Sequence, residues 1–328
     1  MGVSFSVIIP THNRRETLMA AISSALEQTR PPAEIIVVAD GCSDGTQEAV
    51  RSLADRGVSV LDLPKAPGFG YANRNAAVDA AAGDVMAWLG DDDLYLPDHL
   101  ARTGELFDRL DLDVAQANAC IVHPDDRLEP LGMDWRVPRY RELMLADSSR
   151  TPMSAVSHRT ALPGQVGGWD PARAEGGDMD LWQRMLQAGA RTAMLDEPTV
   201  LHFRARDRNQ PYPERVAQSR RYLELPRDPG SLAGLRCEIG LARQHVAAAD
   251  EETTIALQQH AAGTEQRASE LEQRVRALET EVAALRQRSQ QLAELQQGGW
   301  WRLRTALFPL LEPYWRLRGR PGGRRLPP

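Results

Sequence analysis

Residues 34–45, EIIVVADGCSDG, contain the clearest indication of the fold. After its first residue, segment 34–39 is a continuous apolar run, as expected of a strand that is buried on both faces of a parallel sheet. Residues 40–45 form a tight polar loop, and a helical pattern follows over 46–54. The stretch therefore predicts one strand–loop–helix unit of an α/β fold.

The same alternation continues on both sides of this unit. We expect further strands at 3–10, 58–63, 85–89, 114–123 and 191–202, and further helices at 18–26, 68–82 and 177–189. Four strand–helix alternations in the first ninety residues predict a doubly wound α/β sheet. The 328 residues are enough for one large core and an additional segment.

Composition excludes several classes of protein. The formal charge of −6 gives no sign of the basic domain that nucleic-acid binding requires, so no nucleic-acid partner is expected. Three cysteines far apart in sequence predict neither a disulfide framework nor a zinc site, and they fit a reducing compartment. Because no stretch matches a membrane span or a signal peptide, a cytoplasmic protein is expected.

Polar clusters follow three of the expected strands, at residues 11–13, at Asp40 with Asp44, and at residues 91–93. Ligands bind at the carboxyl ends of strands in open α/β sheets. One such cluster would be weak evidence, because strand-to-helix loops are often acidic or rich in Asn through helix capping. Three clusters at equivalent strand ends predict a binding site.

The cluster at 91–93 consists of three consecutive aspartates. Adjacent carboxylates raise one another's pKa unless a cation joins them. Carboxylate oxygens suit Mg²⁺ or Mn²⁺, which are commonly held by one or two carboxylates together with substrate phosphates. The run therefore predicts a Mg²⁺ or Mn²⁺ site; the alternative is a solvated acidic turn that caps a helix near Pro97.

Five segments together resemble glycosyltransferase family 2 of the GT-A fold, and the resemblance implies a doubly wound mixed sheet. They are SVIIPTHN at 6–13, IVVADGCSDGT at 36–46, ANRN at 72–75, the aspartates at 91–93 and GDMDLWQR at 177–184. The resemblance covers about residues 4–210, and the combination is specific although no single motif is.

The resemblance implies a role for individual residues. Contacts to the nucleotide sugar would come from Thr11, Asn13, Asp40, Arg74 and Asp91. The metal would be held mainly by Asp92, with Asp93 and His202 as further candidates. Asp178 would be the general base for the acceptor hydroxyl, and because family members invert the anomeric centre in one displacement, one base suffices.

The chain departs from the family pattern at three positions. Ala39, Gly90 and Gly177 stand where relatives often have an acidic residue. The change at Gly90 shifts the Asp-x-Asp signature, so which aspartate of 91–93 contacts ribose and which contacts metal stays open. His202 has a second interpretation as a surface histidine. For Trp182, a core position is favoured over a place in the acceptor pocket.

Beyond residue 226 the pattern changes to heptads. Leu271, Leu278, Leu285 and Leu292 occupy d positions, and Ala268, Val275, Val282 and Ser289 occupy a positions. This predicts a coiled coil, and the two valines favour a parallel homodimer through residues 257–296. The expected organisation is a GT-A domain at 1–225, a helical coiled-coil segment at 232–297 and a basic aromatic tail at 298–328.

The tail interleaves aromatic residues with arginines. From residue 300 onward there are seven arginines, one acid and three of the seven tryptophans. Such a segment suits the headgroup region of an anionic membrane, which predicts peripheral attachment through 300–318, at the inner face. Pro309 and Pro313 are expected to break a continuous helix. The alternative is a tail that is docked on the catalytic domain or partly disordered.

The expected function is an inverting glycosyltransferase that uses a nucleotide-diphosphate sugar and a glycan or glycolipid acceptor in cell-surface assembly. One alternative is a non-catalytic scaffold of GT-A fold that dimerises through the coiled coil. A nucleotidyltransferase or dinucleotide enzyme is disfavoured, because residues 10–13 (PTHN) are not a glycine-rich phosphate loop.

Overall fold

The computed structural model describes residues 2–146, 151–203, 211–297 and 299–317. The chain divides into two compact units, Met1–Ala249 and Asp250–Pro328. The expected domain boundaries at 225 and 298 stay predictions.

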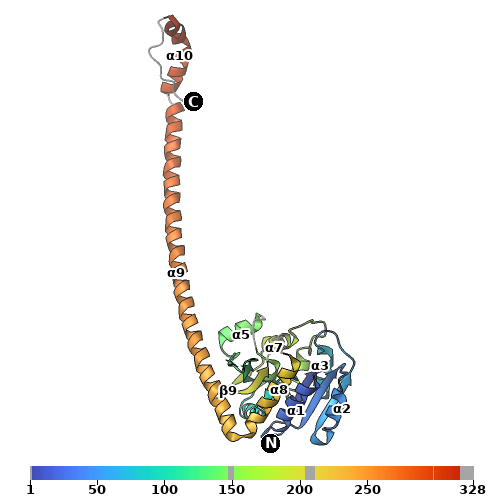
Figure 1. The fold of residues 1–328 in the computed structure, drawn as a ribbon. Coiled ribbons are helices and arrows are strands. Elements are labelled where there is room, and N and C mark those ends of the chain that lie inside the picture. Colours follow the sequence, from blue (N-terminus) through green and yellow to red (C-terminus); the bar gives the residue numbers. More distant parts are fainter. Residues whose placement is uncertain (1, 147–150, 204–210, 298, 318–328) are drawn as a thin grey trace. The chain divides into compact units, whose positions relative to one another are not determined.

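One mixed sheet of nine strands runs through the first unit (Figure 1). The strands are β1 Phe5–Thr11, β2 Glu34–Asp40, β3 Val58–Leu63, β4 Val85–Trp88, β5 Leu94–Tyr95, β6 Val114–Val122, β7 Leu128–Leu131, β8 Val156–Arg159 and β9 Thr192–Phe203. Their order is β3-β2-β1-β4-β8-β6-β9-β5, with β7 paired to β6. β1 to β4 are parallel, whereas β8 runs antiparallel to both of its neighbours, β4 and β6.

Helices cover both faces of this sheet. Those of the first unit are α1 Arg15–Leu26, α2 Thr46–Arg51, α3 Tyr71–Ala80, α4 His99–Arg109, α5 Pro138–Leu145, α6 Leu162–Gln165, α7 Gly177–Gln187 and α8 Tyr212–Glu224. Three short 3₁₀ turns, η1 Ala54–Arg56, η2 Met153–Ala155 and η3 Leu225–Arg227, complete it.

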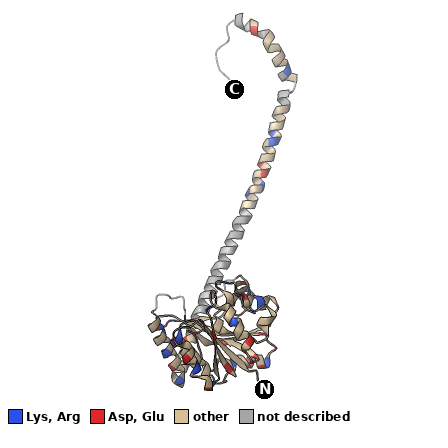
Figure 2. Cartoon of the chain, turned by 90° about the vertical axis from the view of Figure 1, so that its right-hand side faces the viewer, with Lys and Arg blue, Asp and Glu red and all other residues tan. Residues whose placement is uncertain are grey.

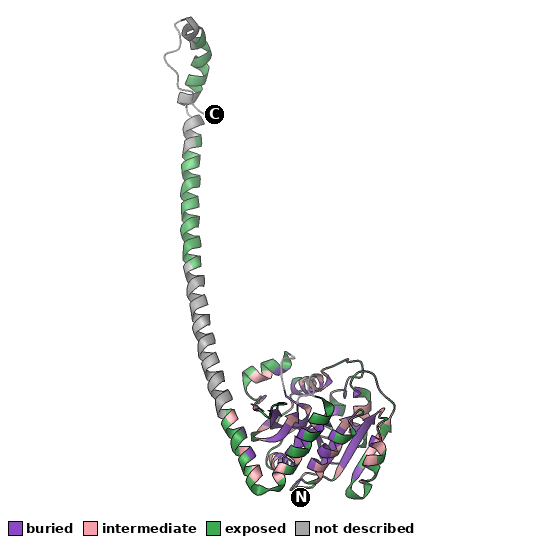
Figure 3. Ribbon diagram, viewed as in Figure 1, coloured by how far each residue is buried: buried purple, intermediate pink, exposed green. Residues whose placement is uncertain are grey.

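Two hydrophobic clusters show why the sheet is buried on both sides. In β1, Val7 and Ile9 join α1, α2 and α4 in one cluster, and Ile8 joins α3 and α7 in the other. Successive side chains of a strand point to opposite faces, so a continuous apolar run serves both layers. Figure 3 shows these strands as buried. Trp182 is fully buried on α7, which confirms its predicted core position.

The sequence did not predict strands β5, β7 and β8 or helices α5, α6 and α8, and it indicated α4 only as the helix near Pro97 that an acidic turn would cap. The four residues of β8, VSHR, have no strand-like alternation of apolar side chains. Their place between β4 and β6 is set by pairing with residues about 40 to 70 positions away. Together with β5 and β7, which also pair antiparallel to their neighbours, β8 makes the sheet mixed.

The C-terminal part is helical. α9 spans Pro229–Gln297 and α10 spans Gly299–Leu317. The first turns of α9 belong to the first unit, where Leu235 and Ile239 are buried against β9 and α8. In the described part of its second half, charged residues of both signs lie along α9 (Figure 2).

The expected helix break in the tail is wrong, because α10 continues through Pro309 and Pro313. Each proline removes one backbone hydrogen bond, and their spacing of four residues places both losses on the same face of the helix. None of the described helices has both the length and the apolar character that a bilayer crossing requires.

Candidate active site

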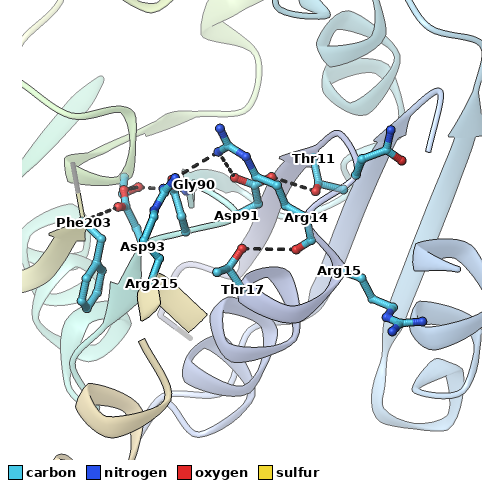
Figure 4. Close-up of polar contacts among 12 residues, drawn as sticks. Thr11, Arg14, Arg15, Thr17, Gly90, Asp91, Asp93, Phe203 and Arg215 are labelled. Atoms are coloured by element: carbon cyan, nitrogen blue, oxygen red, sulfur yellow. Dashed lines mark hydrogen bonds and ion pairs between the residues drawn. The ribbon is translucent and has the colours of Figure 1, made fainter. Parts of the chain in front are cut away.

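The three aspartates lie in the loop between β4 and β5, and all three are buried. Asp91 accepts a hydrogen bond from Thr11 Oγ1 at 2.8 Å and one from Arg14 Nη1 at 3.0 Å. Thr11 ends β1 and Arg14 directly precedes α1. The first polar cluster predicted from the sequence therefore contacts the third cluster directly (Figure 4).

Asp92 has a different environment. Its Oδ2 accepts hydrogen bonds from Arg14 Nη1 at 3.2 Å and from Arg215 Nη2, on α8, at 2.6 Å. Within the described residues, Oδ1 has no hydrogen-bond partner. Burial raises the pKa of Asp92 to about 7, and the charges of Asp91 and Asp93 act in the same direction while the two arginines oppose them.

Asp93 anchors the loop to other elements. Its carboxylate accepts a hydrogen bond from Ser154 of η2 and a backbone N–H bond from Phe203 at 3.1 Å. His202 Nδ1 lies 2.9 Å from Oδ1. Ser154 Oγ also accepts the backbone N–H of Gly90 at 2.9 Å. His202 therefore faces the aspartate loop, and the contacts of Asp93 fix the position of that loop.

Asp40 lies at the end of β2, and three hydrogen-bond donors surround its carboxylate. Oδ1 accepts from Ala66 N at 2.7 Å and Asn73 Nδ2 at 2.6 Å, and Oδ2 accepts from Lys65 Nζ at 2.7 Å. Asn13 lies nearby in the β1–α1 loop, with φ at +54°, and its Oδ1 accepts the backbone N–H of Ser43 at 2.7 Å. In this arrangement Asn13 joins two loops at the sheet edge.

Arg74 on α3 is held by aromatic rings and charge. Its guanidinium carbon lies 5.0 Å from the ring centroid of Tyr71 and 4.7 Å from that of Trp169. Burial lowers the pKa of Arg74, while the carboxylates of Asp178, Asp91 and Asp40 act to raise it, as does Tyr71. Arg74 is thus within electrostatic range of an acid from each of three predicted motifs.

Asp178 is in the first turn of α7, and α3 positions this turn. Tyr71 Oη accepts the backbone N–H of Gly177 at 3.0 Å. A Cβ added at Gly177 would lie only 2.6 Å from the Tyr71 ring, so the close approach requires glycine.

The second acid of this motif, Asp180, forms ion pairs with Arg173 at 3.1 Å and with Arg184 at 2.6 Å. Asp178 has no ion pair with any described residue. Of the two acids, only Asp178 is therefore available to act on a bound acceptor.

Known proteins resemble this chain in sequence and in fold. Residues 6–162 match the model of glycosyl transferase family 2. This segment, just under half of the chain, is therefore similar to the family 2 glycosyltransferases. Among curated relatives, the succinoglycan biosynthesis protein ExoO of Rhizobium meliloti is 29% identical over 211 residues, which cover 60% of each chain. The Escherichia coli UDP-Glc:alpha-D-GlcNAc-diphosphoundecaprenol beta-1,3-glucosyltransferase WfgD is 36% identical over 95 residues, 29% of this chain and 37% of that one.

A crystal structure of S. aureus TarS 1-349 in complex with UDP-GlcNAc has a similar fold. It superposes with a TM-score of 0.54 at 20% identity, over 68% of this chain and 66% of that one. At this identity the likeness concerns the fold, and it confirms the GT-A-like α/β architecture expected from the sequence. The chain spans less than two thirds of the length of the first relatives, 60% of ExoO for example.

The candidate site offers few protein ligands for Mg²⁺ or Mn²⁺. Among the described residues, no group of three or more His, Cys, Asp and Glu side chains is arranged to hold a metal. The unpartnered Oδ1 of Asp92 provides one carboxylate ligand, and such ions commonly take their remaining ligands from water and substrate phosphates. The residues therefore fit a metal that is bound together with a diphosphate.

Several residues of the site were not predicted from the sequence. They are Arg14, Lys65, Asn73, Ser154 and Arg215. Arg14 and Asn73 lie beside or within recognised motifs, so their position was a usable signal. Ser154 and Arg215 carry no local signal, because they lie 61 and 123 residues from the aspartates they contact.

Proposed function

We propose that this chain is an inverting, metal-dependent glycosyltransferase that moves a sugar from a nucleotide-diphosphate sugar to an acceptor hydroxyl. The observation that carries the proposal is the position of Arg74, whose charge interacts with Asp40, Asp91 and Asp178. These acids come from the strand ends predicted to bind the donor and from the helix predicted to supply the base. Their proximity supports a site in which donor and acceptor meet.

In the proposed reaction, Asp178 accepts the proton of the acceptor hydroxyl as its oxygen attacks the anomeric carbon. The bond from that carbon to the diphosphate breaks, and the configuration inverts. When bound, Mg²⁺ or Mn²⁺ would neutralise charge on the leaving diphosphate from the side of Asp92. Thr11 and Asp91 would contact the nucleotide sugar, with Asp40 and Asn13 at the nucleotide end of the sheet edge.

A role in cell-surface polysaccharide or glycolipid assembly is supported by the relatives. ExoO is named for succinoglycan biosynthesis, and WfgD for transfer of glucose to a diphosphoundecaprenol-linked sugar. The apolar heptad positions described in α9 are exposed, with Leu271 at 64% and Leu278 at 54%. This exposure supports a homodimer through residues 257–296, and Val275 and Val282 at a positions favour a parallel one.

The tail supports peripheral membrane attachment at the cytoplasmic face. Leu303, Leu307 and Leu310 recur at helical spacing on α10 and are exposed. Arg302 and Arg304 in the same segment are exposed too. An exposed apolar stripe beside arginines suits an anionic interface through residues 300–318.

The direct test is binding of UDP-, GDP- and dTDP-sugars with Mn²⁺, followed by product mass. A donor that binds should raise the Tm of the full chain, and Asp92→Ala should abolish that rise because the metal-bridged diphosphate loses its carboxylate. If none of these donors, nor any nucleoside diphosphate, shifts the Tm of the wild-type chain, the proposed activity is contradicted.

A further inference from the structure

Two arginines converge on one oxygen of the aspartate loop. Arg14 Nη1 and Arg215 Nη2 lie 3.2 Å and 2.6 Å from Asp92 Oδ2. They come from opposite ends of the domain sequence, the start of α1 and the first turn of α8. Figure 4 shows Arg14 approaching from the side of Thr11 and Arg215 from the side of Phe203.

The contacts within the protein use only part of the capacity of these arginines. A guanidinium has five N–H donors in a planar fork. Among the described residues, one terminal nitrogen of each engages a carboxylate: Arg14 Nη1 reaches Asp91 and Asp92, and Arg215 Nη2 reaches Asp92. The remaining donors are available for another anion, and planar guanidinium groups bind phosphate in a bidentate manner.

A purely structural role does not explain Arg215 well. α8 is already joined to α1 by Arg220, which pairs with Glu16 at 3.1 Å, and the following turn η3 is joined to it by Arg227, which pairs with Glu27 at 2.7 Å. Both of these pairs are exposed, whereas the side chain of Arg215 is only 14% exposed. The guanidinium of Arg215 places positive charge beside Asp92. In the proposed reaction, negative charge would develop there on the leaving diphosphate.

We propose that Arg14 and Arg215 form a clamp that binds the diphosphate of the donor and stabilises it as it leaves. This inference rests on the proposed function and assigns two residues to it that the motifs do not include. In the free protein, Asp91 and Asp92 hold both guanidinium groups ready beside the place that the β-phosphate occupies. On binding, the unused N–H donors bond the phosphate oxygens, and charge neutralisation needs no large rearrangement.

The test is calorimetric titration of the full chain with UDP, UMP, GDP, GMP and inorganic pyrophosphate, in Mg²⁺ buffer. Arg215→Gln should weaken binding of diphosphates and pyrophosphate by about 10-fold or more, since hydrogen bonds to charged groups are lost. Binding of the monophosphates should change by less than about 2-fold, because the clamp contacts the β-phosphate. Arg14→Gln should act in the same direction, and Arg215→Lys should recover part of the loss.

The matched control is Arg220→Gln, which removes an ion pair of α8 without touching the aspartates and should leave all affinities unchanged. Unchanged or tighter diphosphate binding by Arg215→Gln would overturn the clamp and show that this arginine only neutralises Asp92. If Arg215→Gln does not fold, the more exposed Arg14→Gln decides by the same titrations.

Failure of the proposed function is separable from failure of the clamp. A wild-type chain that binds no nucleoside diphosphate contradicts the glycosyltransferase proposal. Pyrophosphate then tests the arginines alone: binding that is lost in Arg215→Gln supports an anion clamp, and absence of pyrophosphate binding by the wild type overturns it.

Discussion

The two units of the chain satisfy their side chains in opposite ways. In Met1–Ala249, buried polar groups find partners far away in sequence, as Asp93 does with Phe203, 110 residues on. In Asp250–Pro328, every side chain whose exposure is described is exposed, including Leu278 at 54% and Phe308 at 65%. The first unit is stabilised by its own core, whereas the described apolar residues of the second are exposed, as expected of a surface that contacts a partner or a membrane.

The two units also differ in their chemistry. Among the described residues, the groups whose pKa shifts are resolved all lie in the first unit, where burial and neighbouring charges act together, as they do on Asp92 and Arg74. Catalysis is therefore expected to depend on single residues of the first unit. The second unit is expected to act through its oligomeric state and location.

The largest effect is expected for Asp178→Asn. Loss of the base should lower the transfer rate by about 10²- to 10⁴-fold, because proton removal from the acceptor is lost while the site stays intact. Donor binding, measured by the same Tm shift as in the wild type, should be retained. Asp180→Asn is a useful comparison, since Asp180 is occupied by Arg173 and Arg184 and its loss should affect folding stability more than chemistry. Undiminished turnover in Asp178→Asn would place the base elsewhere.

The sequence predicts features that depend on neighbouring residues better than features that depend on residues far away in the chain. β2 was expected within one residue, because a buried parallel strand has a continuous apolar run. β3 lies at the expected residues 58–63, although it is only partly buried at the edge of the sheet. The predicted strand-end clusters do meet, as the Thr11–Asp91 hydrogen bond shows. Arg215 and Ser154 could not be predicted, since their contacts depend on how α8 and η2 pack and leave no periodic pattern.

The second prediction concerns the seam of α9, by which we mean its exposed apolar a and d positions. Leu278→Lys places a charge at a d position and should convert a dimer of the full chain to monomer at micromolar concentration, as measured by sedimentation. Thr280→Lys, two residues away at an f position, is the matched control and should leave the dimer intact. A monomeric wild type, or equal behaviour of both variants, would break the proposed link between seam and dimer.

The third prediction concerns the tail. A chain that ends at Gln297 should float with anionic liposomes less than the full chain does. Arg302→Glu with Arg304→Glu should give an intermediate loss, at about 1 kcal/mol for each basic residue near the surface. Both arginines are exposed, so the change should not alter the fold of the first unit. Equal flotation of the full and shortened chains would leave the apolar stripe of α10 without a membrane role.

The smallest effect concerns the pH dependence of stability in the first unit. His158 is fully buried, and its Nε2 accepts a hydrogen bond from Trp88 Nε1 at 2.8 Å, so the ring is held neutral. Burial lowers the pKa of His158 to about 4. The unfolded chain, with an ordinary histidine pKa of about 6.5, binds more protons below that pH, so stability falls as pH decreases from 6.5 towards 4.

At pH 5 this single group should cost about 2 kcal/mol relative to pH 7.5, or several degrees in Tm. His158→Asn should have a lower Tm at pH 7.5 but a smaller further loss on acidification, measured by thermal unfolding at the two pH values. His99 is also buried, and its pKa is lowered to about 3 in the same way, so part of the acid sensitivity should persist in the variant. An acid loss identical to that of the wild type would mean that His158 does not contribute. Because this sensitivity arises from burial within the first unit, a chain that ends at Ala249 should keep all of it, which tests whether the first unit is stabilised by its own core.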